Sequence, residues 1–121
     1  LYEVVDEQRP EALSRVDRIR LANNDLPPMY VNGDADKMLD PLISALFAED
    51  VSAFPRTVII SSEYDYLRYQ DELFAKRLQD AGVDVTAIRY RGCDHGFFEM
   101  YGVMPQAEDV CRVISEELAK I

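Results

Sequence analysis

The sequence predicts an α/β protein in which two parallel strands are joined by a helix and covered by a second helix. A β-branched run without alternation, residues 57–62, is typical of a strand that is buried on both faces. Residues 67–81 and 107–121 carry apolar residues at helical spacing, and a second β-prone run lies between them at residues 83–90. The order strand, helix, strand, loop, helix indicates a βαβ crossover, and therefore a parallel sheet.

The first part of the chain is predicted to be less regular. Apolar residues at helical spacing predict a short amphipathic helix over residues 10–21, with Pro10 in its first turn. The run MYV, residues 29–31, is interpreted as a strand or an extended segment, and turn-rich residues follow it. The run LISALFAED, residues 42–50, is expected to form one or two helical turns before Pro55.

The regular part of the chain begins with the strand TVIISS, residues 57–62. The helix after it ends before Gly82, since glycine commonly terminates helices. The second strand, VDVTAIRY at residues 83–90, alternates in part, which indicates a position near a sheet edge. The apolar faces of the two helices are formed by Leu67, Phe74, Leu78 and Ala81 in the first and by Ala107, Val110, Cys111, Ile114, Leu118 and Ile121 in the second.

These elements do not complete a sheet. A unit of two strands is marginal on its own, and the only other strand candidate, residues 29–31, is short. The chain also begins at Leu1 without an initiator methionine. We therefore expect a piece of a longer protein, and we expect self-association or strand exchange through the uncovered sheet edge.

Composition restricts the class of protein. The 121 residues are one domain's worth of sequence, and a hydrophobic content of 48% is ordinary for a globular chain. The net charge of −10 repels phosphates and anionic lipids, so a nucleic-acid partner is not expected. No apolar run is long enough to span a membrane, and the acidic first residues are unlike a secretory signal. Two cysteines, Cys93 and Cys111, suit neither a disulfide framework nor a zinc site, which predicts a reducing cytoplasm.

Candidate chemistry lies just after the two predicted strands. Asp65 follows the first strand and His95, the only histidine, follows the second. Adjacent parallel strands are about 4.8 Å apart, and functional groups collect at their carboxyl ends. Asp65 could therefore accept a hydrogen bond from the imidazole, fix its tautomer and stabilise an imidazolium. Gly92 and Gly96 would allow the sharp turn that presents His95.

Other interpretations of the same residues stay open. A lone histidine in a glycine-containing loop is often a surface or packing residue, and Asp65 could simply cap the next helix. Asp94 is a rival partner for His95, and Cys93 a rival nucleophile, although sequence neighbours seldom face each other in a turn. The pair Phe97–Phe98 is interpreted as packing, with a pocket wall as the second possibility.

The motifs DPLISALF, EYDYLR and HGFF, with a helix ending in AGV between the last two, resemble a known family. From about Asp40 onward the chain is similar to the carboxyl-terminal part of an α/β-hydrolase of the hormone-sensitive-lipase-like group of bacterial carboxylesterases. The resemblance implies that Asp65 is the acid and His95 the base of a catalytic triad. It also implies a cap-like or lid-like helical segment over residues 1–32, an incomplete hydrolase domain over residues 33–121, and no metal or organic cofactor.

The chain departs from the family pattern at three positions. Tyr66 and Ala45 stand where the family has proline, and Tyr69 stands where it has an aspartate. These changes bear on the shape of the substrate pocket rather than on the acid and the base.

The family's nucleophile has no counterpart in this sequence. The family needs a serine on a G-x-S-x-G turn, which precedes the acid and the histidine in the chain. None of the serines has a glycine two positions away: Ser14, Ser44, Ser52, Ser61, Ser62 and Ser115. The expected function is therefore that of the carboxyl-terminal part of a serine carboxylesterase or lipase acting on small acyl esters, inactive as an isolated chain. The alternatives are a non-catalytic interaction domain with a hydrolase-like tail, or part of a prolyl-oligopeptidase-like peptidase.

Overall fold

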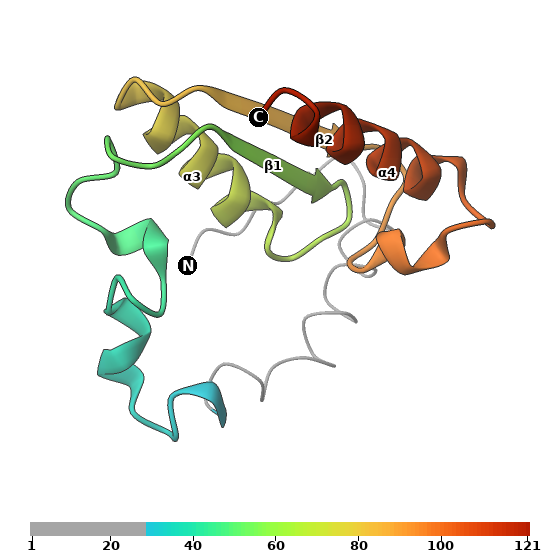
Figure 1. The fold of residues 1–121 in the computed structure, drawn as a ribbon. Coiled ribbons are helices and arrows are strands. Elements are labelled where there is room, and N and C mark those ends of the chain that lie inside the picture. The colour runs from blue at the N-terminus through green and yellow to red at the C-terminus, as the bar shows by residue number, and fades with distance from the viewer. Residues whose placement is uncertain (1–28) are drawn as a thin grey trace, which may run out of the picture.

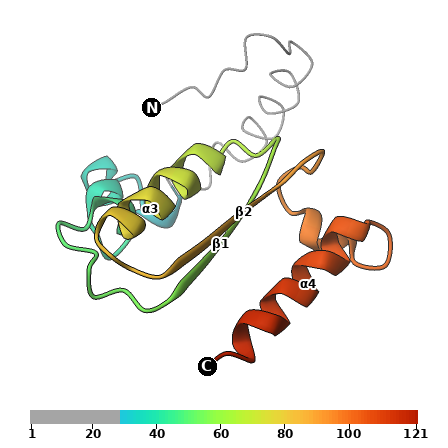
Figure 2. The same cartoon turned by 90° about the horizontal axis from the view of Figure 1, so that it is seen from above.

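The predicted βαβ unit and its covering helix are present in a computed structural model, which describes residues 29–121 (Figure 1). The strands β1 (Thr57–Ser62) and β2 (Val85–Tyr90) are parallel, and α3 (Arg68–Asp80) connects them. The last helix, α4 (Pro105–Leu118), follows β2. Figure 2 shows α3 on one face of the strand pair and α4 on the other. The amphipathic helix predicted over residues 10–21 lies outside the described residues.

The two strands pair in a single register, from Thr57 opposite Val85 to Ser62 opposite Tyr90. The bounds of β1 are those predicted. The second strand begins at Val85 rather than at residue 83, because the Val83 amide still bonds the carbonyl of Leu78 at the end of α3, at 3.0 Å. Within residues 29–121 the sheet contains these two strands alone.

The end of α3 follows from its sequence. Gly82 adopts the left-handed conformation, with φ of 84°, and its amide bonds the carbonyl of Gln79 at 3.0 Å. Together with the bond from Val83 to Leu78, this is a Schellman motif, which satisfies the last carbonyls of the helix. The buried residues of α3 are Ala75 and Leu78. The predicted helix and its glycine stop are both confirmed.

The segment before β1 forms short 3₁₀ helices, η1 (Ala35–Leu39) and η2 (Ala45–Phe47). The second agrees with the helical turn predicted in residues 42–50. It is held to α3 by the Arg77 guanidinium, which donates to the carbonyl of Ala48 at 2.6 Å and also to that of Leu46. Phe54 adds an edge-to-face contact with Phe74 of α3, at 5.5 Å between ring centroids.

The interpretation of residues 29–31 as a strand or an extended segment is wrong. Met29 and Tyr30 are helical, and Val31 begins a turn. The turn contains two consecutive left-handed residues, Asn32 with φ of 55° and Gly33 with φ of 77°. Such a reversal prevents the chain from running on as a strand, so β-propensity in three residues was outweighed by the Asn-Gly pair after them.

The hydrophobic core near α4 is small. Tyr90, Cys93, Phe97 and Val110 are buried together, and the rings of Tyr90 and Phe97 are 5.2 Å apart. The predicted apolar face of α4 is only half covered. Its first part is buried at Ala107 and Val110, whereas Ile114 and Leu118 are 37% and 63% exposed, and Ile121 lies beyond the helix. A sheet of two strands is too narrow to cover the whole face.

Three polar contacts join residues from different elements. Arg56, just before β1, pairs with Asp84 at 2.7 Å and with Glu117 near the end of α4. Tyr90 donates from its hydroxyl to Asp109 of α4 at 2.8 Å. Burial, with the bond to Asp109 as the second cause, raises the pKa of Tyr90 to about 12. None of the helices within residues 29–121 has the length and apolar character needed to cross a membrane.

Candidate active site

The loops after β1 and β2 lie at the same end of the molecule (Figure 1). Asp65 lies in the first loop and His95 in the second. Nδ1 of His95 is 2.8 Å from Oδ2 of Asp65, so the predicted hydrogen bond between these two side chains is present. The two residues are 30 positions apart in the sequence, and the parallel pairing of the strands brings them together.

The Asp65 carboxylate is the centre of a small hydrogen-bond network. Its Oδ1 accepts the backbone N–H of Leu67 at 2.8 Å, and its Oδ2 is also 3.4 Å from the hydroxyl of Ser62. The Leu67 bond closes the turn that leads into α3, but the N-cap of α3 is Leu67 and has no side-chain capping bond, so the alternative interpretation of Asp65 as a helix cap is wrong and its carboxylate holds the loop instead. It serves His95 at the same time, through the other oxygen. The side chain of Asp65 is only 10% exposed, which keeps the carboxylate in one orientation.

The orientation of His95 determines which of its nitrogens is available. A carboxylate only accepts hydrogen bonds, so the bond to Asp65 requires the hydrogen on Nδ1. In the neutral imidazole, Nε2 then carries the lone pair. The ring of Tyr66 lies beside the imidazole, with centroids 5.7 Å apart. The His95 side chain remains 44% exposed, so the imidazole can reach a further group.

The structure also tests the other interpretations of the residues around His95. The partner of His95 Nδ1 is Asp65 and not Asp94. Cys93 is fully buried, with its Sγ 3.6 Å from the carbonyl of Arg91, so it is not placed to act as a nucleophile. Phe97 packs in the core, whereas Phe98 is 49% exposed. Both phenylalanines also border a cavity of about 310 Å³ that Asp65 and His95 line, so the pair has a packing and a wall role together.

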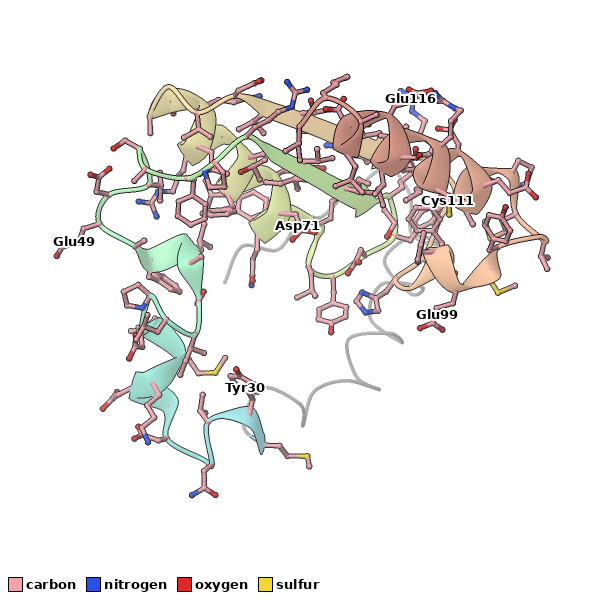
Figure 3. All side chains as sticks on the ribbon, viewed as in Figure 1. Tyr30, Glu49, Asp71, Glu99, Cys111 and Glu116 are labelled. Atoms are coloured by element: carbon pink, nitrogen blue, oxygen red, sulfur yellow. The ribbon has the colours of Figure 1, made fainter. Side chains whose placement is uncertain are left out.

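Two residues near the site were not singled out from the sequence. Ser62 is the last residue of β1 and is 3% exposed, which leaves its hydroxyl facing Asp65. Asp71 lies in the first turn of α3 and is labelled in Figure 3. The signal for Ser62 was a polar residue closing a buried strand. Within the described part of the chain, no group of three or more histidine, cysteine or acidic residues could hold a metal ion.

Asp71, beside the site, has a carboxyl pKa that differs strongly from its ordinary value. Burial, followed by the negative charges of Asp65 and Glu72, raises the pKa of the Asp71 carboxyl to about 6, and His95 opposes this effect. The folded-state pKa is thus above the ordinary value of 3.8. Below that ordinary value the residue is protonated in both states and does not oppose folding. As the pH rises towards the folded-state pKa, ionisation of Asp71 increasingly favours the unfolded chain.

Replacing Asp71 by asparagine is therefore expected to stabilise the protein at neutral pH. After allowance for its partial exposure, we expect the free energy of unfolding to rise by about 1 kcal/mol at about pH 7.5 and to change little at about pH 4. Urea denaturation at a series of pH values measures this. Asp80→Asn, a surface change of the same charge on the same helix, is the matched control and should show no such gain. Equal stability of Asp71→Asn and wild type at every pH would contradict the assignment.

Comparison with known proteins identifies the family of this chain. A family model described as an alpha/beta hydrolase fold matches residues 7–99. An arylesterase of Saccharolobus solfataricus is 41% identical over 69 residues, which are 57% of this chain and 22% of that protein. The human arylacetamide deacetylase-like 3 is 53% identical over 61 residues, 49% of this chain and 15% of that protein. A solved esterase of Pyrobaculum calidifontis aligns with a TM-score of 0.64 and 36% identity, over 67% of this chain and 26% of that one.

These matches agree with the resemblance drawn from the sequence motifs. The chain spans about a fifth of the length of the arylesterase and less of the human relative. The family match begins at residue 7, upstream of the Asp40 start expected from the motifs. The chain belongs to the α/β-hydrolase family, in the hormone-sensitive-lipase-like group of esterases.

Proposed function

We propose that this chain supplies the acid and the base of a serine carboxylic ester hydrolase. The observation that carries the proposal is the hydrogen bond between Asp65 and Nδ1 of His95, in loops at the carboxyl ends of neighbouring parallel strands. That position is where catalytic groups of open α/β sheets collect. Three of the matched proteins are named as an arylesterase, an esterase and a neutral cholesterol ester hydrolase. These names support an esterase over the prolyl-oligopeptidase-like alternative.

In the proposed mechanism, Nε2 of His95 takes the proton of a serine hydroxyl as that oxygen attacks the ester carbonyl. The imidazolium then returns the proton to the departing alcohol, which leaves an acyl-enzyme. His95 next takes a proton from water as that water attacks the acyl-enzyme, and the imidazolium returns this proton to the serine oxygen as the acid leaves. Asp65 stays ionised throughout. It holds the imidazole in the required tautomer and stabilises the imidazolium.

We propose that the serine comes from a part of the protein outside residues 1–121. No serine of this sequence has the G-x-S-x-G setting. Ser62 lines the same cavity as Asp65 and His95, but it is buried and its hydroxyl is 3.4 Å from Oδ2 of the acid Asp65. Small acyl esters are the proposed substrates, and residues 1–32 are proposed to be cap or lid material. The free thiols of Cys93 and Cys111 support a cytoplasmic location.

The free edge of β1 supports a further part of the proposal. Within residues 29–121, β2 pairs along one side of β1 only. We propose that the other side pairs with a strand of the intact hydrolase sheet. We also propose that, in the 121-residue chain alone, a second copy pairs with the same edge, which is the basis for the expected self-association.

A serine-directed probe tests the proposed function. We expect a fluorophosphonate to label the product of the complete reading frame on a serine outside these 121 residues, and not to label the 121-residue chain. Replacing His95 by glutamine in the complete protein should slow the labelling strongly, because the serine loses its base. Mass spectrometry of the labelled peptide identifies the serine. Stoichiometric labelling of any serine within residues 1–121 would overturn the proposed division of the triad.

A further inference from the structure

The loops that carry Asp65 and His95 are joined beyond the ends of the strands. The backbone N–H of Glu63 donates to the carbonyl of Tyr90 at 2.9 Å, and the N–H of Tyr64 donates to the carbonyl of Cys93 at 3.0 Å. These bonds continue the β1–β2 pairing into the loops. Further along the two loops, the next bond between them is the one from His95 to Asp65. The position of the imidazole therefore depends on the loop contacts that precede it.

One side chain strengthens this connection. The carboxylate of Glu63 accepts the backbone N–H of Gly92 through Oε2 at 2.8 Å. Gly92 has φ of 74°, a conformation that glycine adopts without strain, and it turns the chain out of β2 towards His95. A hydrogen bond to a charged acceptor is stronger than one between neutral groups. The backbone of Glu63 is also held, since its carbonyl accepts Nη1 of Arg68 in α3 at 3.0 Å.

We propose that Glu63 is a positioning residue for His95. Its carboxylate fixes the turn at Gly92, and that turn sets where the imidazole stands relative to Asp65. Because the carboxylate bonds the Gly92 amide and the imidazole bonds Asp65, the effect of Glu63 passes through the backbone of the histidine loop. The catalytic consequence rests on the proposed function, whereas the structural consequence does not.

The expected effect follows from the geometry of the pair. In the Glu63→Ala variant, water replaces the carboxylate as the acceptor of the Gly92 amide. The turn is then no longer bonded to the loop after β1. His95 then samples orientations in which Nδ1 is too far from Asp65 for a hydrogen bond. A displacement of about 1 Å at a catalytic group lowers the rate by about 10²-fold. The Glu63→Gln variant keeps an oxygen acceptor for Gly92, so it should retain most of the wild-type behaviour.

The tautomer of His95 tests the structural step directly. Because His95 is the only histidine, long-range ¹H–¹⁵N correlation spectra of the uniformly labelled chain contain one imidazole. In the neutral imidazole of wild type, the hydrogen should be on Nδ1. Glu63→Ala should shift the ring towards the Nε2–H form that free imidazoles favour, and Glu63→Gln should resemble wild type. Glu99→Ala is the matched control, since Glu99 lies in the same loop region and points away from the body of the protein in Figure 3.

Ester hydrolysis by the complete protein tests the catalytic step. Glu63→Ala should lower kcat by about 10- to 100-fold with little change in KM, while Glu63→Gln and Glu99→Ala stay within about threefold of wild type. An unchanged tautomer in Glu63→Ala would overturn the positioning role, even in an active enzyme. A shifted tautomer in a protein without esterase activity would leave that role standing and overturn the proposed function instead. Circular dichroism of each variant identifies any loss of fold, in which case the Glu63→Gln comparison decides.

Discussion

Replacing His95 by alanine in the complete protein is expected to lower kcat for ester hydrolysis by a factor on the order of 10⁶. In the proposed mechanism the imidazole takes the serine proton through Nε2, which carries the lone pair of the neutral ring when Nδ1 donates to Asp65. KM should change little, since His95 contributes to the chemical step rather than to binding of the ester. Steady-state hydrolysis of a short p-nitrophenyl ester measures both constants.

Two comparisons make the His95 result specific. Lys76→Ala, a change at an exposed residue of α3 that pairs with Asp80, should retain wild-type kcat. The fold of His95→Ala should also be intact, because the side chain is 44% exposed and contributes little to the core. Retention of more than about a tenth of the wild-type kcat would remove His95 from the role of base.

The second large effect is expected for Asp65→Asn, with a fall in kcat on the order of 10⁴. An asparagine has nearly the same shape, and its Oδ1 can still accept the Leu67 amide at the start of α3. Its NH₂ group, however, can face the imidazole and donate to Nδ1. That would place the hydrogen on Nε2, where the lone pair is needed, and would leave the imidazolium without its counter-charge.

The Asp65→Asn effect can be separated from unfolding. Thermal denaturation should give a similar midpoint for wild type and variant, because the bond from the Leu67 amide to the side chain at position 65 survives. In NMR spectra, the His95 ring of the variant should carry its hydrogen on Nε2, whereas the ring of wild type should carry it on Nδ1. If the tautomer stays on Nδ1 and kcat falls by less than about tenfold, Asp65 is not the orienting acid.

The strands and helices were predictable where hydrophobic pattern and turn chemistry agree. The β-branched run at residues 57–62 became β1 with the predicted bounds, and the apolar face before Gly82 became α3. The interpretation of residues 29–31 failed because an Asn-Gly reversal follows them. The apolar residues of α4 were predicted to form one buried face along the whole helix, yet the second half of that face is exposed at Leu118. Periodicity reports what a helix can bury, while burial depends on the area of the sheet available to cover it.

The site was predictable to the extent that it depends on strand ends. Asp65 and His95 follow parallel neighbours, so their approach could be inferred from the order of the elements. The contact between Glu63 and Gly92 joins residues 29 positions apart through one side-chain oxygen and one backbone amide. Neither residue type identifies the other as its partner, and the raised pKa of Asp71 depends on burial in the folded chain. Such features follow from loop paths, which the sequence pattern does not determine.

The single register of β1 against β2 has a consequence for how this family can change in length. The distance between the acid and the base is set by the two loops that begin after Ser62 and Tyr90, which lie opposite each other. Residues added to the exposed turn between α3 and β2 lengthen the crossover but leave that pairing in place, and loop length alone costs little. One residue added between Tyr90 and His95 would instead displace the base from its partner. Natural insertions and engineered tags should therefore be found in the crossover and excluded from the two short loops.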